Sequence, residues 1–151
     1  MSKTPGDGRS VVSAVWRGSF YDRIVVDCPA CGGKALITLT AQAANGRRLV
    51  CHDCHLTRDL LEPPRDRLVD PFMGLRPRLR AETRHGDLVA RNEDHLDYLE
   101  QYLSGRLRVE IVQDGGLRNA SVVSRLPVWA KSAKNRDEIL KAIAKVRREK
   151  L

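Results

Sequence analysis

Four cysteines are the residues of this chain best suited to chemistry, and they occur in two pairs. Each pair has two residues between its members, and residues 32–50 separate the pairs: Cys28 and Cys31, then Cys51 and Cys54. Two thiolates three positions apart on a tight turn can face one ion, and a second such turn completes a tetrahedron of sulfurs. A gap of about 15–20 residues between such pairs is typical of zinc sites. We expect one zinc ion, structural because four thiolates fill its coordination shell.

Two disulfides, or two redox-active Cys-x-x-Cys motifs, are alternative interpretations of the same cysteines. Disulfides require an oxidising compartment, and the apolar stretch over residues 11–16 is too short for the core of an export signal. A redox motif normally begins a helix, whereas a strand is expected after the first pair. His52 and His55 could also replace a cysteine, since imidazole binds zinc. We expect four cysteine ligands in a cytoplasmic protein.

The residues around the two pairs predict an antiparallel ribbon. Gly32 and Gly33 follow the first pair, where a tight turn around a metal requires an unusual backbone conformation. Residues 32–41 are expected to form a turn and then a strand with alternating side chains. Asn45-Gly46 is expected as a two-residue hairpin turn. A second strand over residues 47–50 then leads into the second pair.

This order of turns and strands resembles the zinc ribbon of TFIIB-type transcription factors and of many small bacterial proteins. The resemblance rests on Cys28-Pro-Ala-Cys-Gly, the gap and Cys51-x-x-Cys54, and covers about residues 24–60. It implies a zinc ribbon, a fold that binds DNA, RNA or protein. Residues 126–140 are also similar to the tail of small, uncharacterised bacterial zinc-ribbon proteins, which implies a shared architecture and no activity. His55 departs from the ribbon pattern, which often has glycine there, so a left-handed residue is expected.

A linker and a second hairpin are expected after the ribbon. Three prolines within residues 62–72 disfavour regular structure. From Leu75 to Ala81 arginines alternate with apolar residues and Pro77, which predicts an edge strand with one apolar and one arginine face. Residues 84–87 are expected to turn, and residues 88–91 to form the returning strand.

The rest of the chain predicts helices. Asn92 should cap a helix with an apolar stripe over residues 95–108, with His95 at its surface or boundary. A short helix is expected over residues 119–125, and Trp129 is expected to pack between helices. The last helix should start at Asn135, with Glu138 completing a capping box. The predicted fold class is therefore α+β: an N-terminal segment (1–23), a zinc ribbon (24–61), a Pro-rich linker (62–74), and a hairpin with a helical C-terminal half (75–151).

Charge points to an anionic partner. Lys and Arg total 27 against 19 Asp and Glu, a net charge of +8, and the planar guanidinium of Arg binds phosphate through two hydrogen bonds. Successive arginines on the predicted β-strand would lie about 6.6–7 Å apart. This is close to the distance between successive phosphates in an extended single strand of nucleic acid. We expect phosphate contacts to DNA or RNA from seven residues: Arg76, Arg78, Arg80, Arg84, Lys141, Lys145 and Arg148.

Other classes of function have less support in the sequence. The alternative to nucleic-acid binding is a protein-interaction module that docks its ribbon on a larger complex such as RNA polymerase or the ribosome. The sequence contains no phosphate-binding loop, hydrolase elbow or deaminase signature. We therefore expect no enzyme and no small-molecule substrate. No apolar run approaches the roughly 20 residues that span a membrane, so no membrane partner is expected.

Overall fold

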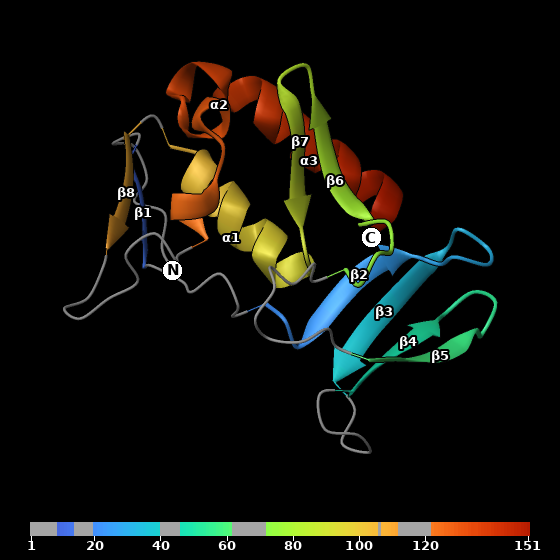
Figure 1. Cartoon of the computed structure of the whole chain (residues 1–151). Coiled ribbons are helices and arrows are strands. Elements are labelled where there is room, and N and C mark those ends of the chain that lie inside the picture. The colour runs from blue at the N-terminus through green and yellow to red at the C-terminus, as the bar shows by residue number, and fades with distance from the viewer. Residues whose placement is uncertain (1–8, 14–19, 40–45, 62–71, 106, 112–121) are drawn as a thin grey trace.

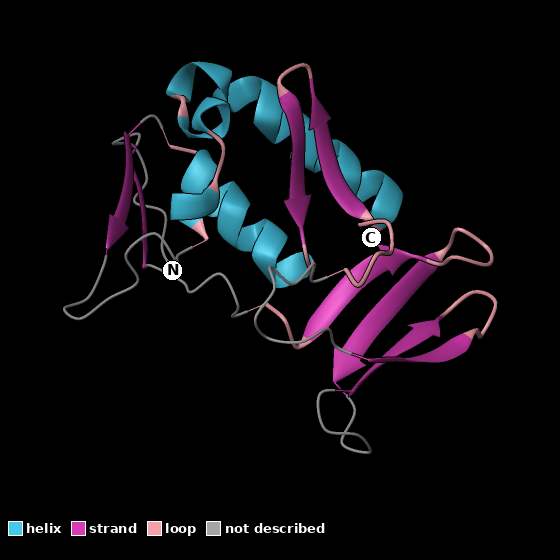
Figure 2. Cartoon of the chain, viewed as in Figure 1, coloured by secondary structure: helices cyan, strands magenta, loops and turns pink. Residues whose placement is uncertain are grey.

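The computed structural model describes residues 9–13, 20–39, 46–61, 72–105, 107–111 and 122–151 (Figure 1). These residues form three β-sheets and three α-helices (Figure 2), which confirms the predicted α+β class. Residues 62–71 of the predicted linker lie outside the described residues, as do Gly115 and Gly116. Among the described helices, none has the length and apolar character needed to cross a membrane.

Four antiparallel strands build the ribbon. In sheet order they are β2 (Arg23–Asp27), β3 (Lys34–Leu39), β4 (Gly46–Cys51) and β5 (Thr57–Leu61). The side chains on one face form a buried apolar cluster, because alternate residues of a strand point the same way. That cluster contains Ile24, Val26, Ala35, Ile37 and Leu49, next to Cys28 and Cys51. Burial of each large aliphatic side chain contributes roughly 1.5–3 kcal/mol.

The predicted two-residue turn at Asn45-Gly46 is wrong. Gly46 is the first residue of β4 and pairs with Leu61 of β5, and Leu39 pairs with Arg47. Residues 40–46 therefore separate the paired residues of β3 and β4, which is too long a connection for a two-residue turn. Gly46 is instead paired with β5, a strand that the prediction lacked.

The second hairpin consists of β6 (Leu79–Thr83) and β7 (Gly86–Ala90), and it packs against α3 (Arg136–Lys150). The predicted strand start at Leu75 is wrong, because the chain before Leu79 lies against β2 instead. There the backbone N–H of Asp27 donates to the carbonyl of Arg76 at 2.9 Å, and Val26 forms a bridge with Pro77. The ribbon and the hairpin are therefore joined along β2.

The first helix, α1 (Glu93–Leu103), begins as predicted, since the side chain of Asn92 accepts a hydrogen bond from the N–H of His95. Its predicted extension to residue 108 is wrong. Residues Leu107–Ile111 form β8, which pairs in parallel with β1 (Arg9–Ser13). His95 is not at the surface: it is 7% exposed, and its ring stacks on Phe20. Parallel pairing with a strand near the N-terminus cannot be inferred from helical periodicity.

The segments that precede α3 pack into the same core as α3. A 3-10 helix (Val123–Arg125) and the short helix α2 (Val128–Lys131) precede α3. Trp129 of α2 packs against the main core and stacks on His85 of the hairpin turn, with ring centroids 5.8 Å apart. The predicted capping box is wrong, because the amide of Asn135 donates to the carbonyl of Trp129 instead.

The main core lies between the hairpin, α1 and α3, in the layer that Figure 1 shows beside the ribbon. Val25 of β2 belongs to this core, while its neighbours Ile24 and Val26 belong to the ribbon cluster. Alternation along a single strand thus places β2 in both apolar clusters. The end of β2, where the first cysteine pair begins, is held by both parts of the molecule.

Candidate metal centre and cationic cavity

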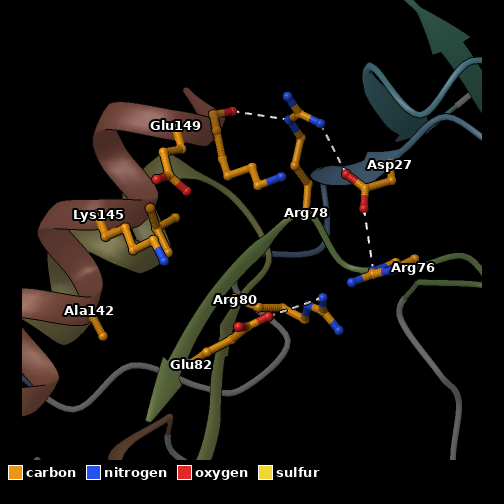
Figure 3. A pocket seen from close by; sticks show the side chains of 10 residues that line it. Asp27, Arg76, Arg78, Arg80, Glu82, Ala142, Lys145 and Glu149 are labelled. Atoms are coloured by element: carbon orange, nitrogen blue, oxygen red, sulfur yellow. Dashed lines mark hydrogen bonds and ion pairs between the residues drawn. The ribbon is translucent and has the colours of Figure 1, made fainter.

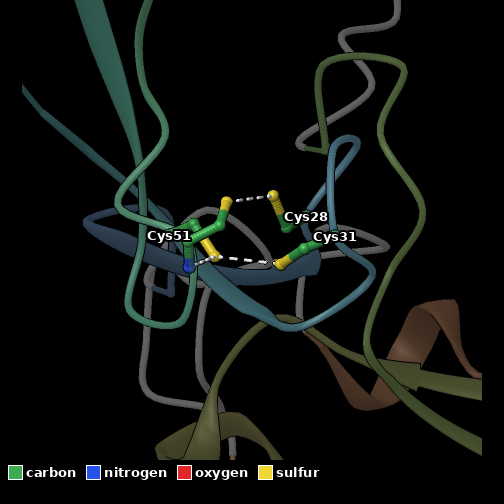
Figure 4. A group of neighbouring side chains, drawn as sticks. Cys28, Cys31 and Cys51 are labelled. Atoms are coloured by element: carbon green, nitrogen blue, oxygen red, sulfur yellow. Dashed lines mark hydrogen bonds between the residues drawn. The ribbon is translucent and has the colours of Figure 1, made fainter.

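The four cysteines lie together at the end of the ribbon. Their sulfurs all lie within 4.8 Å of one another, and among the described residues the cluster contains no other metal-ligating side chain. The Sγ atoms of Cys28 and Cys54 are 3.7 Å apart, and those of Cys31 and Cys51 are 3.5 Å apart (Figure 4). A disulfide requires about 2.05 Å, so these are free thiols. The arrangement can hold one metal ion.

Two matching turns position the sulfurs. Each turn starts at the end of a strand and contains a residue with a left-handed backbone four positions after its first cysteine. Gly32 occupies that position in the first turn with φ of 74°, and His55 occupies it in the second with φ of 63°. The left-handed conformation expected at His55 is therefore confirmed. Both His52 and His55 are exposed, and neither belongs to the cysteine cluster.

Backbone amides point at the sulfurs. The N–H of Ala30 donates to Cys28 at 3.4 Å, and the N–H of Gly33 donates to Cys31 at 3.3 Å. In the second turn, the N–H of Asp53 donates to Cys51 at 3.3 Å. Such hydrogen bonds stabilise thiolates, the form that binds metals.

The thiols hinder one another's ionisation when no cation lies between them. Hydrogen bonds from backbone N–H groups, first that of Cys31, lower the pKa of Cys28 to about 6. The N–H of Gly33 lowers the pKa of Cys31, but the interaction with Cys51 opposes it, and the net effect raises this pKa to about 12. One thiolate therefore forms readily and disfavours the next, and a bound cation would remove that repulsion.

A cationic cavity of about 300 Å³ lies beside the metal centre, between β6 and α3 (Figure 3). Five basic residues line it: Arg76, Arg78, Arg80, Lys145 and Lys150. Three acidic residues also line it: Asp27, Glu82 and Glu149. Asp27 is the last residue of β2 and directly precedes the cysteine Cys28. The cavity and the metal centre therefore meet at two consecutive residues.

Arg78 is held in place by three acceptors from different elements. Its guanidinium donates to Asp27 Oδ1 at 3.0 Å, to the carbonyl of Gly32 at 3.3 Å, and to the carbonyl of Lys150 at 3.1 Å. Its side chain is only 15% exposed. Arg78 thus connects the first metal turn to the C-terminal end of α3. Arg78 therefore has a structural role. The alternation along residues 75–81 had predicted that its side chain would lie on an exposed face of a strand.

The other basic groups are held more loosely. Arg76 lies 3.6 Å from Asp27 Oδ2, and its side chain is 64% exposed. Arg80 lies 3.5 Å from Glu82. For Lys145, exposed on α3, the described part of the chain supplies no ion-pair partner. These three side chains have donors to offer a ligand.

The remaining predicted contacts lie outside the cavity. Arg84 is in the β6–β7 turn, 3.2 Å from Glu138 Oε2. Lys141 and Arg148 are exposed on α3 and do not line the cavity. Four of the seven predicted residues therefore converge on one cavity. Asp27, which organises it, was missed, although its place next to Cys28 was visible in the sequence.

A second cavity of about 330 Å³ lies on the other side of the hairpin, between β7 and the 3-10 helix, and His95 lines it. The ring Nδ1 of His95 accepts a hydrogen bond from the N–H of Arg91 at 3.0 Å. Burial, together with the positive charge of Arg91, lowers the pKa of His95 to about 3. His95 is therefore neutral at physiological pH and titrates only in strong acid.

Comparison with known proteins adds no assignment. No protein-family model, no curated protein and no solved structure matches this chain. The metal centre and the cationic cavity are therefore the features from which function is argued.

Proposed function

We propose that this chain is a zinc-ribbon protein that binds nucleic acid through phosphate contacts and does not catalyse a reaction. Zinc fits the donor set, because thiolates at about 2.3 Å in a tetrahedron lie about 3.8 Å from one another. The Sγ pairs of Cys28 with Cys54 and of Cys31 with Cys51, at 3.7 and 3.5 Å, are close to that spacing. Four thiolates leave no open position, so the ion would fix the two turns and supply folding free energy.

The observation that supports nucleic-acid binding is the convergence of basic side chains on one cavity. Arg76 and Arg80 come from the chain around β6, and Lys145 comes from α3, more than sixty residues later. Their ion pairs, where present, are 3.5 Å or longer. Each pair has one well-exposed partner, Arg76 at 64% and Glu82 at 67%, and such solvent-screened ion pairs contribute roughly 0–1 kcal/mol. A phosphate can therefore replace or join the carboxylates at small cost.

The basic surface continues beyond the cavity along α3. Lys141 and Arg148 are exposed on this helix, one on each side of Lys145 in sequence. With a net charge of +8, such a surface favours binding that depends on charge more than on base sequence. Each neutralised phosphate then adds roughly 0.7–0.9 to the slope of log affinity against log salt.

Docking of the ribbon on a larger protein complex is the second candidate function. Leu39, at the end of β3, is 59% exposed, and β5 is the edge strand of the ribbon sheet. An exposed apolar side chain and a strand edge are features that protein partners use. The resemblance to TFIIB-type ribbons is compatible with either candidate, since such ribbons bind nucleic acids and proteins.

The test compares two variants that each lose three positive charges. The cavity variant carries Arg76→Gln, Arg80→Gln and Lys145→Gln, and leaves the structural Arg78 intact. The control variant carries Arg58→Gln, Arg125→Gln and Lys134→Gln, all exposed and outside the cavity. Fluorescence anisotropy with labelled single- and double-stranded DNA and RNA is measured between 50 and 200 mM salt, on the order of the range over which such binding changes most.

We expect the cavity variant to lower the salt slope by about two to three units, and the control variant to lower it by less than one. Equal losses in both variants would show that net charge alone drives binding. If the parent protein binds none of the four nucleic acids near physiological salt, the nucleic-acid function is wrong. Protein docking through the ribbon then becomes the leading candidate.

A further inference from the structure

The charges that line the cationic cavity are unbalanced by two. Its five basic residues exceed its three acidic residues, and all eight come from the end of β2, from β6 and the residues just before it, and from α3. An internal phosphodiester carries one negative charge. A phosphate monoester carries close to two at neutral pH, since its second pKa is about 6. The excess of positive charge therefore matches a monoester better than a diester.

The residues that line the cavity fall into two groups. Arg78 and Asp27 form a fixed wall, and Arg76, Arg80 and Lys145 are adjustable donors. Arg78 uses its N–H groups on Asp27, Gly32 and Lys150, and Asp27 also faces Arg76. These contacts fix the wall nearest the metal centre. Within the described part of the chain, Arg76 and Arg80 have long ion pairs and Lys145 has none, so these side chains can reorient toward a ligand.

Basic side chains reach the cavity from two opposite sides. Figure 3 shows side chains of α3 on one side and those of Arg76, Arg78 and Arg80 on the other, facing a common space. A cavity of about 300 Å³ is large enough to take a phosphate group together with part of its sugar.

We propose that this cavity recognises a phosphate monoester at the end of a nucleic-acid strand in preference to an internal phosphodiester. The inference rests on the proposed nucleic-acid function and names the group that the cavity binds. Arg76 and Arg80 would donate paired N–H groups to the terminal oxygens, a geometry that guanidinium suits. Lys145 would supply the charge from the opposite side.

The experiment uses one oligonucleotide sequence with three ends: 5′-hydroxyl, 5′-phosphate and 3′-phosphate. Affinities for the zinc-loaded protein are measured by competition against a labelled strand. One added charge-assisted hydrogen bond corresponds to roughly ten-fold or more in affinity, so we expect a preference of about that size for a phosphorylated end. The preference should shrink below about pH 6, where the monoester gains a proton.

Two lysines one helical turn apart provide a matched pair of variants. Lys145 lines the cavity, whereas Lys141 is exposed on the same helix and does not. Lys145→Gln should abolish the preference for a phosphorylated end. Lys141→Gln should retain it, although both variants lose one positive charge. Zinc content and circular dichroism of each variant verify that the fold is kept.

The outcomes separate this inference from the proposed function. Equal affinity for hydroxyl and phosphate ends, with salt-dependent binding intact, would overturn the terminal site and leave nucleic-acid binding in place. Binding of adenosine monophosphate in a Lys145-dependent manner, with no binding of any oligonucleotide, would support the monoester site and overturn the nucleic-acid function. Absence of binding for all these probes would overturn both.

Discussion

Arg78 offers the sharpest test of how the metal centre is supported. Its guanidinium joins Asp27 and Gly32, which flank or belong to the first metal turn, to the carbonyl of Lys150. In Arg78→Lys the charge remains, but a single ammonium cannot reproduce the planar fork that serves three acceptors. We expect the first turn to lose part of its support, and the metal to be held less tightly.

The expected magnitude follows from these contacts. Hydrogen bonds that involve a charged group contribute roughly 1.5–3 kcal/mol each, and the low exposure of the Arg78 side chain, 15%, limits the loss to solvent screening. One such bond, that to Gly32, acts directly on the metal turn. That bond is 3.3 Å long and solvent-exposed, so its loss corresponds to the lower end of this energy range, about a ten-fold fall in zinc affinity.

Zinc affinity is measured by competition with a chelator of known affinity, and the unfolding free energy by urea titration. Arg80→Lys is the matched control, because Arg80 lies two residues along the chain and, among the described residues, its ion pair is with the exposed Glu82 at 3.5 Å. The control should keep the zinc affinity of the parent. If Arg78→Lys also keeps it, Arg78 does not support the metal turn, and the coupling argued from Gly32 and Asp27 is refuted.

Two further predictions concern the metal ligands and the buried histidine. Elemental analysis should find one zinc per chain, and Cys28→Ser or Cys54→Ser should lose the metal and unfold the ribbon; freely reactive thiols in the native parent would contradict this. His95 has a folded-state pKa of about 3, against about 6.5 when unfolded. Above pH 6.5, the neutral ring of His95 makes its full contribution to the unfolding free energy. As the pH falls from 6.5 toward 3, this contribution is lost, because the histidine takes up a proton in the unfolded state and not in the folded state. Between pH 7.5 and 5 this removes about 2 kcal/mol of unfolding free energy. His95→Asn, which can still accept from the N–H of Arg91, should lack that part of the loss in urea titrations, and a parallel loss in both proteins would assign the effect elsewhere.

The metal centre could be predicted from the sequence because its determinants are local. Two residues between paired cysteines set the turn, and a left-handed residue four positions after the first cysteine completes it. Both Gly32 and His55 adopt that conformation. The antiparallel ribbon between the pairs follows from alternation, and the structure confirms it. These signals all lie within residues 24–60, although Arg78 adds support to the first turn from outside that range.

The errors occur where a distant segment decides the local structure. Leu107 continues the four-residue spacing of Leu99 and Leu103, yet it lies in β8 because β1 pairs with it. Gly105 follows the helix end closely, and glycine there is a common stop signal, which the prediction of a helix to residue 108 did not use. His95 has the sequence context of a surface residue in a first turn, but Phe20 stacks on its ring.

The arginine segment shows the same limit at the site itself. Alternation along residues 75–81 predicts three equivalent arginines on one face of a strand, and the structure gives each a different role. The backbone of Arg76 and Arg78 bonds to β2, so the strand starts only at Leu79. Asp27 then takes Arg78 as a fixed partner and leaves Arg76 exposed. Asp27 is a sequence neighbour of Cys28 and a spatial neighbour of these arginines, so the cavity depends on the strand that carries the first metal turn. A search for basic residues alone finds the cations of this site, whereas their division into a fixed wall and adjustable donors depends on where one carboxylate lies.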